Sequence, residues 1–212
     1  MPPPFARDLV RFAIVAAGVV AIGSMFINQP VPVAEIANST NQTALEDSNA
    51  PSTTIVPEPS DYRQDDYRKP VPATLKGATV LDAAQALDLW SSNTAIFIDV
   101  YPRPPKPANL PAGTLWRDPS HQSIEHAKWL PNVGYGVLST AVDSYFRNTL
   151  MKLTQADMAK PIVFFCVRNC WMSWNSAKRA LAYGFTRVYW FPDGTDAWQE
   201  IGQLVLDVQP EK

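Results

Sequence analysis

Residues 161–185, PIVFFCVRNCWMSWNSAKRALAYGF, decide the fold. The apolar run 162–165 follows a proline and is typical of a strand that is buried on both faces of a parallel sheet. The apolar residues that recur afterwards at helical spacing are Trp174, Ala177 and Leu181. Gly184 then ends the helical pattern as a C-terminal cap. The stretch therefore predicts a strand, a short loop that begins at Cys166, and an amphipathic helix.

Further strands and helices are predicted on both sides of this stretch. Residues 95–100 (AIFIDV) and 188–191 (VYWF) are short apolar runs, and Asp99 lies near the end of the first. Apolar residues at helical spacing also follow Asp82, a candidate N-cap. The predicted helices lie at 83–90, 140–153 and 197–201. Alternating strands and helices predict a single α/β domain with a mostly parallel central sheet and helices on both faces.

The N-terminus has the pattern of an export signal. Arg7 and Arg11 precede sixteen residues, 12–27, that carry no charge. This run is slightly shorter than the roughly 20 residues of a membrane-spanning helix, and no clear cleavage site follows it. We therefore expect residues 1–34 to be either a signal peptide or an N-terminal membrane anchor. Export would place the domain in an oxidising compartment.

Two more segments differ in composition from the core. Residues 35–70 are rich in Ser, Thr, Asn, Asp and Pro, which predicts a disordered linker whose last ten residues lie against the domain. The domain itself is expected at 71–208. Within it, residues 101–136 form a long segment that is interrupted by Pro and Gly, here called the excursion, and we expect this segment to line a site. The net charge of -2 gives no basic excess for phosphates, so nucleic acid is not an expected partner.

The only two cysteines, Cys166 and Cys170, lie in the loop between the predicted strand and helix. A thiolate is the nucleophilic form of cysteine, and backbone N–H groups at a helix N-terminus stabilise it. We therefore interpret Cys166 as a reactive thiol; the alternative is an inert, buried cysteine. Cys170 is a resolving thiol, a disulfide partner or a structural loop residue. Neither His121 nor His126 gives the usual metal-ligand spacing with them, so no metal is expected.

Four other residues are candidates for substrate binding: Arg168, Trp171, Ser173 and Asp99. Arg168 adds positive charge inside the loop, as do Lys178 and Arg179 along the helix, and this charge would lower the thiol pKa or hold an anion. The alternative for these cations is a solvated surface. Asp99 is otherwise a cap for the turn that follows it, and Trp171 is otherwise a core residue.

Several motifs resemble the rhodanese superfamily over about residues 71–206. These are PIVFFC with its loop, NSAKRALAYGF, RVYWF and DGTDAW, together with the earlier strand AIFIDV. A closer resemblance is to small exported proteins that are associated with PQQ-dependent alcohol catabolism and named for a Cys-Cys-Trp motif. FFCVRNCWMSWNSAKRA, YPRPPKPANLPAGTLWRD, KWLPNVGYG and FPDGTDAW carry it.

The resemblance implies a rhodanese-like domain in the bacterial periplasm. With the N-terminal segment, we expect a protein that is periplasmic, secreted or tethered to the inner membrane by that segment. Cys166 falls on the sulfur-accepting position, which implies a cysteine persulfide intermediate and no stably bound cofactor. PQQ would be associated through the pathway only, and the implied partners are a PQQ-dependent alcohol dehydrogenase or its cytochrome. The loop is one residue longer than the loop of common sulfurtransferases and contains Cys170 as a second cysteine.

Three functions follow as hypotheses. In the first, Cys166 is a sulfurtransferase nucleophile that carries sulfur as a persulfide. In the second, Cys166 and Cys170 cycle between dithiol and disulfide. In the third, the domain is a non-catalytic accessory module that presents residues 101–136 and Trp171 to a partner.

Overall fold

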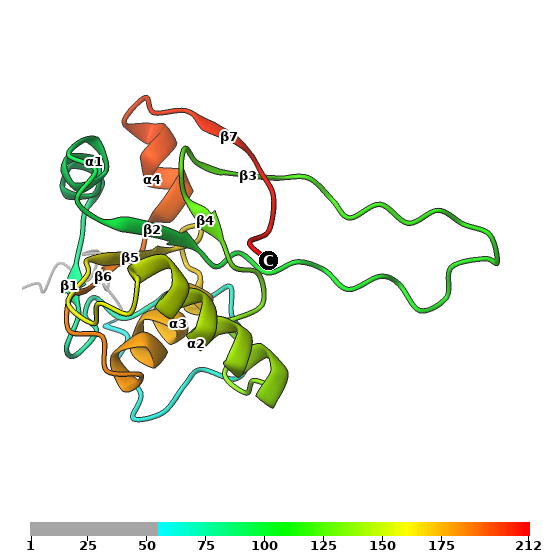
Figure 1. The fold of residues 1–212 in the computed structure, drawn as a ribbon, viewed down its shortest axis with the longest axis horizontal. Helices are drawn as coiled ribbons and strands as arrows, with labels where there is room; N and C mark the ends of the chain where they lie inside the picture. Colours follow the sequence, from blue (N-terminus) through cyan, green and yellow to red (C-terminus); the bar gives the residue numbers. More distant parts are fainter. Residues whose placement is uncertain (1–54) are drawn as a thin grey trace, which may run out of the picture. The chain divides into compact units, whose positions relative to one another are not determined.

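The computed structural model describes residues 55–212. Five parallel strands form the main sheet in the order β1-β6-β5-β2-β4 (Figure 1). They are β1 (Thr79–Val80), β2 (Ile96–Asp99), β4 (Lys128–Trp129), β5 (Ile162–Phe165) and β6 (Val188–Phe191). A separate antiparallel pair consists of β3 (His121–Ile124) and β7 (Val205–Val208). The expected signal or anchor at 1–34, and linker residues up to 54, lie outside the described residues.

Helices cover both faces of the main sheet. They are α1 (Ala83–Ser91), α2 (Thr140–Thr154), α3 (Trp171–Ala182) and α4 (Gly194–Glu200). The core between the sheet and α2 and α3 is one hydrophobic cluster, and the core beside α1 and α4 is a second one. Figure 1 shows these two pairs of helices on opposite sides of the strands. The prediction of an α/β domain with a mostly parallel sheet and two helical layers is confirmed.

The central strand β5 determines how the sheet is built. It pairs with β2 on one edge and β6 on the other, and all four of its residues are fully buried. Successive side chains of a strand point to opposite faces. Phe164 therefore packs with α2 and α3, whereas Val163 and Phe165 pack with α1 and α4. Phe165 is in register with Asp99, so β5 and β2 end level with each other.

Asp99 joins the end of β2 to β3. Its carboxylate is fully buried and accepts hydrogen bonds from Ser123 Oγ (2.5 Å) and the Tyr101 N–H (2.8 Å). His121 Nε2 lies 2.7 Å from the same carboxylate, and its ring is stacked on Tyr101 and tilted against Trp129. The carboxylate thus supplies a partner to one buried hydroxyl and to two partly buried nitrogens.

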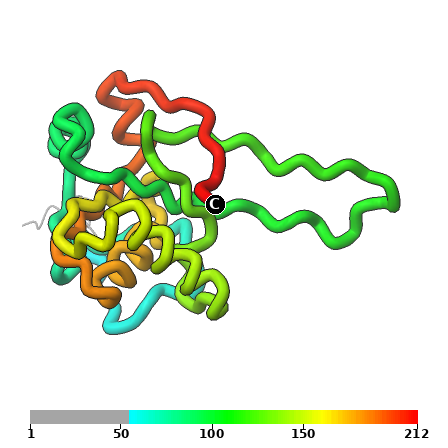
Figure 2. Tube along the Cα trace, in the orientation of Figure 1, coloured from blue at the N-terminus to red at the C-terminus, as the bar shows by residue number. Residues whose placement is uncertain are grey.

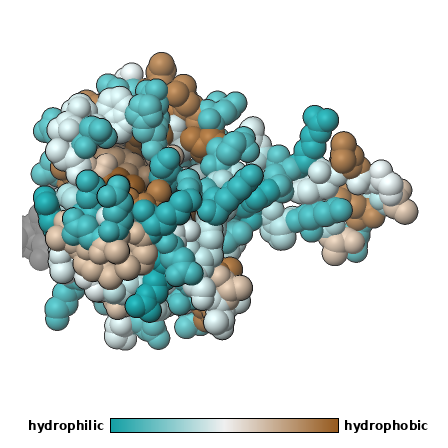
Figure 3. All heavy atoms as spheres, in the orientation of Figure 1, coloured by the Kyte–Doolittle hydropathy of each residue, from teal (hydrophilic) through white to brown (hydrophobic). Residues whose placement is uncertain are grey.

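Sequence reasoning missed the short strands β1, β3, β4 and β7. β3, β4 and β7 contain polar residues. β3 and β4 lie within 101–136, where we expected only a loop. Residues 102–120, before β3, have no regular secondary structure and project from the domain (Figure 2). Apolar side chains gather toward its tip (Figure 3). Leu115, within this segment, is 77% exposed.

Replacing the Asp99 carboxylate is expected to destabilise the domain. In Asp99→Ala, the buried Ser123 hydroxyl and the partly buried Tyr101 N–H and His121 ring nitrogen lose their partner, so the free energy of unfolding should fall by about 3 kcal/mol. Urea denaturation followed by tryptophan fluorescence measures this. Asp207→Ala, at an exposed position on β7, is the control and should change it by less than about 0.5 kcal/mol.

Candidate active site at the cysteine loop

A disulfide joins Cys166 to Cys170 across the loop that follows β5. Their Cα atoms are 6.3 Å apart, within the range of protein disulfides. Cys166 is the first residue after the strand, and Cys170 is the N-cap of α3. Each cysteine is only 1% exposed. The structure therefore brings the two predicted reactive residues together in an oxidised and closed loop.

The start of α4 holds the Cys166 end of the loop. The Thr195 N–H donates to the Cys166 carbonyl oxygen (3.0 Å), and Val167 forms an isolated bridge with Gly194. Gly194 has a left-handed φ of 48°, and a Cβ added there would overlap the Cys166 carbonyl. A glycine is thus required by both the backbone conformation and the close approach.

Arg168 is fully engaged with carboxylates of the α4 region. Its guanidinium forms two hydrogen bonds of 2.7 Å to Glu200 and one of 3.0 Å to Asp193. These hydrogen bonds raise the pKa of Arg168 and, in turn, lower the pKa of Glu200. In this arrangement Arg168 fastens the loop to α4, and its guanidinium already has anionic partners.

Two backbone donors, at Arg168 within the loop and at Trp171 directly after it, also have partners in other segments. The Arg168 N–H donates to an Asp196 carboxylate oxygen (2.9 Å), and the Trp171 N–H donates to the Tyr67 carbonyl oxygen (2.9 Å). The sequence favoured a loop whose N–H groups converge on Cys166 and hold an anion. In the oxidised loop, two of these donors bind oxygen acceptors of other segments instead.

Trp171 and Ser173 support the beginning of α3 from within the core. Ser173 is fully buried; its hydroxyl donates to the Cys170 carbonyl oxygen and accepts from Trp190 Nε1, both at 3.0 Å. Trp171 is 2% exposed and packs edge-on against Trp174, and its indole N–H has no protein acceptor. Both candidate substrate-binding residues therefore lie next to the disulfide but beneath the surface.

Asp99 is not brought together with the disulfide. Asp99 shares its strand face with Phe97, which belongs to the core beside α1 and α4. Cys166 belongs to the other core, beside α2 and α3. The sheet therefore separates the two side chains, and the observed partners of Asp99 give it a structural role.

Lys178 and Arg179 lie along α3, but neither points to the cysteines or forms a purely solvated surface. Arg179 is 5% exposed and donates to the carbonyl oxygens of Val133, Tyr135 and Gly136. Lys178 Nζ donates to three other carbonyl oxygens, at 59–61. Burial lowers the pKa of Lys178, against the opposing effect of nearby carboxylates. Both cations hold irregular segments against the helix.

Sequence reasoning missed the acidic side chains that bind Arg168. Asp193, Asp196 and Glu200 are spaced by three and four residues, which is the spacing of one helical face. This spacing was the signal in the sequence that could have predicted them, because it places three carboxylates on one face where a cation can bind.

The excursion contributes to a cavity of about 470 Å³. Arg103 and Lys106 from the excursion line it, together with Ser139 and Val142 at the start of α2. The cysteine loop does not line this cavity. Within residues 55–212, no helix is long and apolar enough to cross a membrane, and no three Cys, His, Asp or Glu side chains are grouped as metal ligands.

No protein-family model and no curated protein matches the chain. Among solved structures it is similar to a thiosulfate sulfurtransferase from Pseudomonas aeruginosa, at 15% identity and a TM-score of 0.42, over 63% of this chain but only 21% of that one. It is also similar to a polysulfide-sulfur transferase homodimer from Wolinella succinogenes, at 21% identity and a TM-score of 0.38, over 63% and 81% of the two chains.

A third similar structure is a Rhodopseudomonas palustris protein of unknown function, described as a possible tyrosine phosphatase. It shares 17% identity at a TM-score of 0.39, over 64% of this chain and 99% of that one.

The contact between Gly194 and Cys166 gives a stability prediction. Gly194→Ala adds a side chain at a left-handed φ and against the Cys166 carbonyl, whereas Gly202→Ala adds one at a φ of 81° with nothing within 4 Å. In both variants the free energy of unfolding should fall by about 1 kcal/mol because of backbone strain. Gly194→Ala should lose at least about 1 kcal/mol more, because the loop must shift. Urea denaturation compares them; equal losses would contradict the close approach.

Proposed function

We propose that Cys166 and Cys170 are a dithiol–disulfide couple that exchanges electrons with a thiol partner. One observation carries this proposal: the two sulfurs are bonded to each other at the carboxyl end of β5. Ligands of parallel α/β sheets bind at this edge. The engagement of Arg168 with Glu200 and Asp193 supports it further, because the loop is held without an external anion.

The exchange proceeds through a mixed disulfide. A partner thiolate attacks Cys166 Sγ, and Cys170 leaves as a thiolate. Cys170 is the better leaving group because it is the N-cap of α3, where the helix dipole stabilises negative charge. The second partner thiolate then attacks the partner's own sulfur and releases Cys166. Two electrons and two protons pass from the partner dithiol to the protein, and the partner becomes a disulfide.

Sulfur transfer through a persulfide on Cys166 is the second candidate. The position of Cys166 supports it, because this residue directly follows a buried strand and precedes a helix, as the rhodanese resemblance implies. The reaction requires the reduced loop: the Cys166 thiolate attacks the sulfane sulfur of thiosulfate, and sulfite leaves. A persulfide would thus form only after the disulfide has been opened.

The proposed setting is the periplasm, alongside PQQ-dependent alcohol oxidation. The export-like residues 1–34 and the resemblance to the exported Cys-Cys-Trp proteins support it. In this setting the thiol partner is a PQQ-dependent alcohol dehydrogenase or its cytochrome. PQQ itself is assigned to the partner and not to this chain.

Intact-mass spectrometry of the full chain after periplasmic expression tests the couple. We expect the isolated protein to gain about 2 Da on reduction and lose them again with glutathione disulfide, because closing one disulfide removes two hydrogens. Cys166→Ser and Cys170→Ser should each abolish the shift. In Cys170→Ser, Cys166 should hold one glutathione as a stable mixed disulfide.

The same samples separate the two candidates. Thiosulfate added to the reduced protein should leave the mass unchanged if the couple is purely redox-active. A gain of one sulfur, lost in Cys166→Ser, would establish the persulfide chemistry. If the protein is isolated as a dithiol and stays a dithiol when glutathione disulfide is added, the redox couple is refuted.

A further inference from the structure

We propose that residues 57–68, here called the strap, form a lid over the Cys166–Cys170 disulfide, and that the strap must open before a thiol reaches the sulfurs. This inference rests on the proposed redox function. The sequence assigned these residues to the end of a linker. In the structure they pack against α3, starting N-terminal to the domain boundary expected at residue 71.

The strap contacts the site at the peptide bond that follows Cys170. The Tyr67 carbonyl oxygen accepts the N–H of Trp171, whose peptide nitrogen is bonded to Cys170. The Arg63 guanidinium lies 5.3 Å from the centre of the Trp171 ring. The strap therefore covers the first turn of α3 on the side where the disulfide enters the helix.

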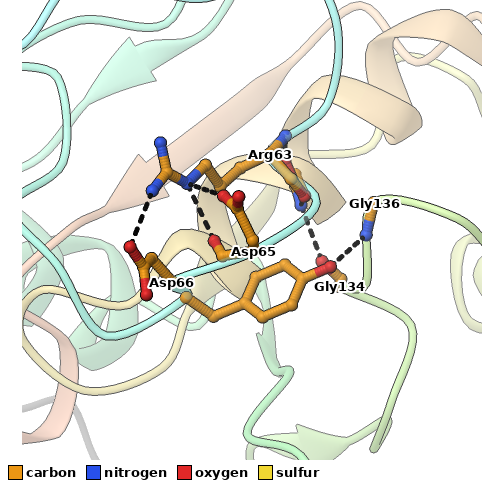
Figure 4. A network of polar contacts seen from close by, with 7 residues as sticks. Arg63, Asp65, Asp66, Gly134 and Gly136 are labelled. Carbon is orange, nitrogen blue, oxygen red and sulfur yellow. Dashed lines mark hydrogen bonds and ion pairs between the residues drawn. The ribbon is translucent and has the colours of Figure 1, made fainter.

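Polar contacts attach the strap to α3 and to the loop after β4. Asn175 is fully buried; its Oδ1 accepts the Arg63 N–H (2.9 Å), and its Nδ2 donates to the carbonyl oxygens of Arg63 (2.8 Å) and Gly134 (2.9 Å). The Gly136 N–H donates to the Tyr67 hydroxyl (3.0 Å). Figure 4 shows this network with Arg63 also paired to Asp65 and Asp66.

A second attachment lies nearer the N-terminal end of the strap. Lys178 Nζ donates to the carbonyl oxygens of Pro59, Ser60 and Asp61, at 3.0, 2.9 and 3.3 Å. Tyr62 packs over Arg179, whose guanidinium carbon lies 4.1 Å from the ring centre. Side chains of α3 thus bind the strap mainly through its backbone carbonyls.

Local opening of the strap is favoured because its attachments are polar and its side chains lie near the surface. No residue of the strap is buried, whereas Pro72 and Leu75, just beyond it, are. A segment with few buried apolar contacts opens at a lower free energy than the whole domain. The strap can therefore leave α3 while residues after 71 remain in the core. Because each sulfur belongs to a residue that is 1% exposed, the in-line attack of a thiolate requires such an opening.

The rate at which dithiothreitol reduces the disulfide tests the lid. Gly136→Ala is the first variant, because a Cβ at Gly136 would overlap the Arg63 carbonyl and displace the strap without touching either cysteine. Lys178→Met is the second, because it removes the donor to three strap carbonyls. Lys160→Met is the matched control, since Lys160 lies before the opposite, amino end of β5.

Oxidised full-length protein is mixed with excess dithiothreitol, and samples are quenched by alkylation at intervals. Intact-mass spectrometry then gives the fraction of reduced protein in each sample. We expect both strap variants to be reduced roughly tenfold faster than the wild type, the effect of losing one to two hydrogen bonds from the closed state. Lys160→Met should match the wild type. Trypsin gives a direct measure of opening, because cleavage after Arg63 and Arg68 should accelerate by a similar factor. Urea midpoints confirm that the variants stay folded.

The outcomes separate this inference from the proposed function. Rates within twofold of the wild type in both folded variants, with faster tryptic cleavage of the strap, would show that the strap opens but does not guard the sulfurs. That result would overturn the lid and leave the redox couple intact. A wild-type protein without a disulfide would overturn the redox couple itself, and with it the lid.

Discussion

The hydrogen bonding of β5 on both edges is the constraint on which the site depends. With β2 on one side and β6 on the other, and with apolar side chains buried on both faces, this strand has no freedom to slide. The chain must leave the sheet after Phe165, which is level with Asp99 of β2, so Cys166 is the first residue of the turn. Because α3 begins at Trp171, the four residues after Cys166 must turn the chain, and the disulfide spans this turn.

The distribution of charge around the turn favours thiol exchange over the binding of a free anion. A sulfurtransferase loop needs unpaired N–H groups and a free cation for thiosulfate and for the persulfide. Here Arg168 is surrounded by Asp193 and Glu200, and its own N–H is bound to Asp196. An anionic substrate would meet these carboxylates at the edge of the loop. A thiol partner needs only a path to one sulfur.

The sequence predicted the parts of the fold in which local pattern and burial agree. The strand at 162–165 and the strand at 188–191 have the expected bounds, and Asp82 caps α1 as expected. The β3–β7 pair was missed because a short strand such as HQSI is defined by its partner and not by its own pattern. The cysteines were found, and a disulfide was one of the alternatives that the sequence left open for Cys170. The contacts of Tyr67 and α4 with the loop were not predicted, because these segments are distant from it in sequence.

The two ends of the loop are held by different segments, and this gives the two cysteines different roles. Cys166 is fixed by β5 and by the Thr195 N–H of α4, which belong to the core. The peptide N–H after Cys170 is bound to Tyr67 of the strap, which has no buried residue. Opening of the strap therefore removes the acceptor of the Trp171 N–H at the Cys170 end of the loop, while the contacts of Cys166 stay in place. The carbonyl of Cys170 remains held by Ser173 in the core. A partner that forms a mixed disulfide needs a fixed sulfur to attack and a second sulfur that leaves as a stabilised thiolate. The fold supplies the first at the end of a buried strand and the second at the start of a helix, where the freed N–H can stabilise the thiolate.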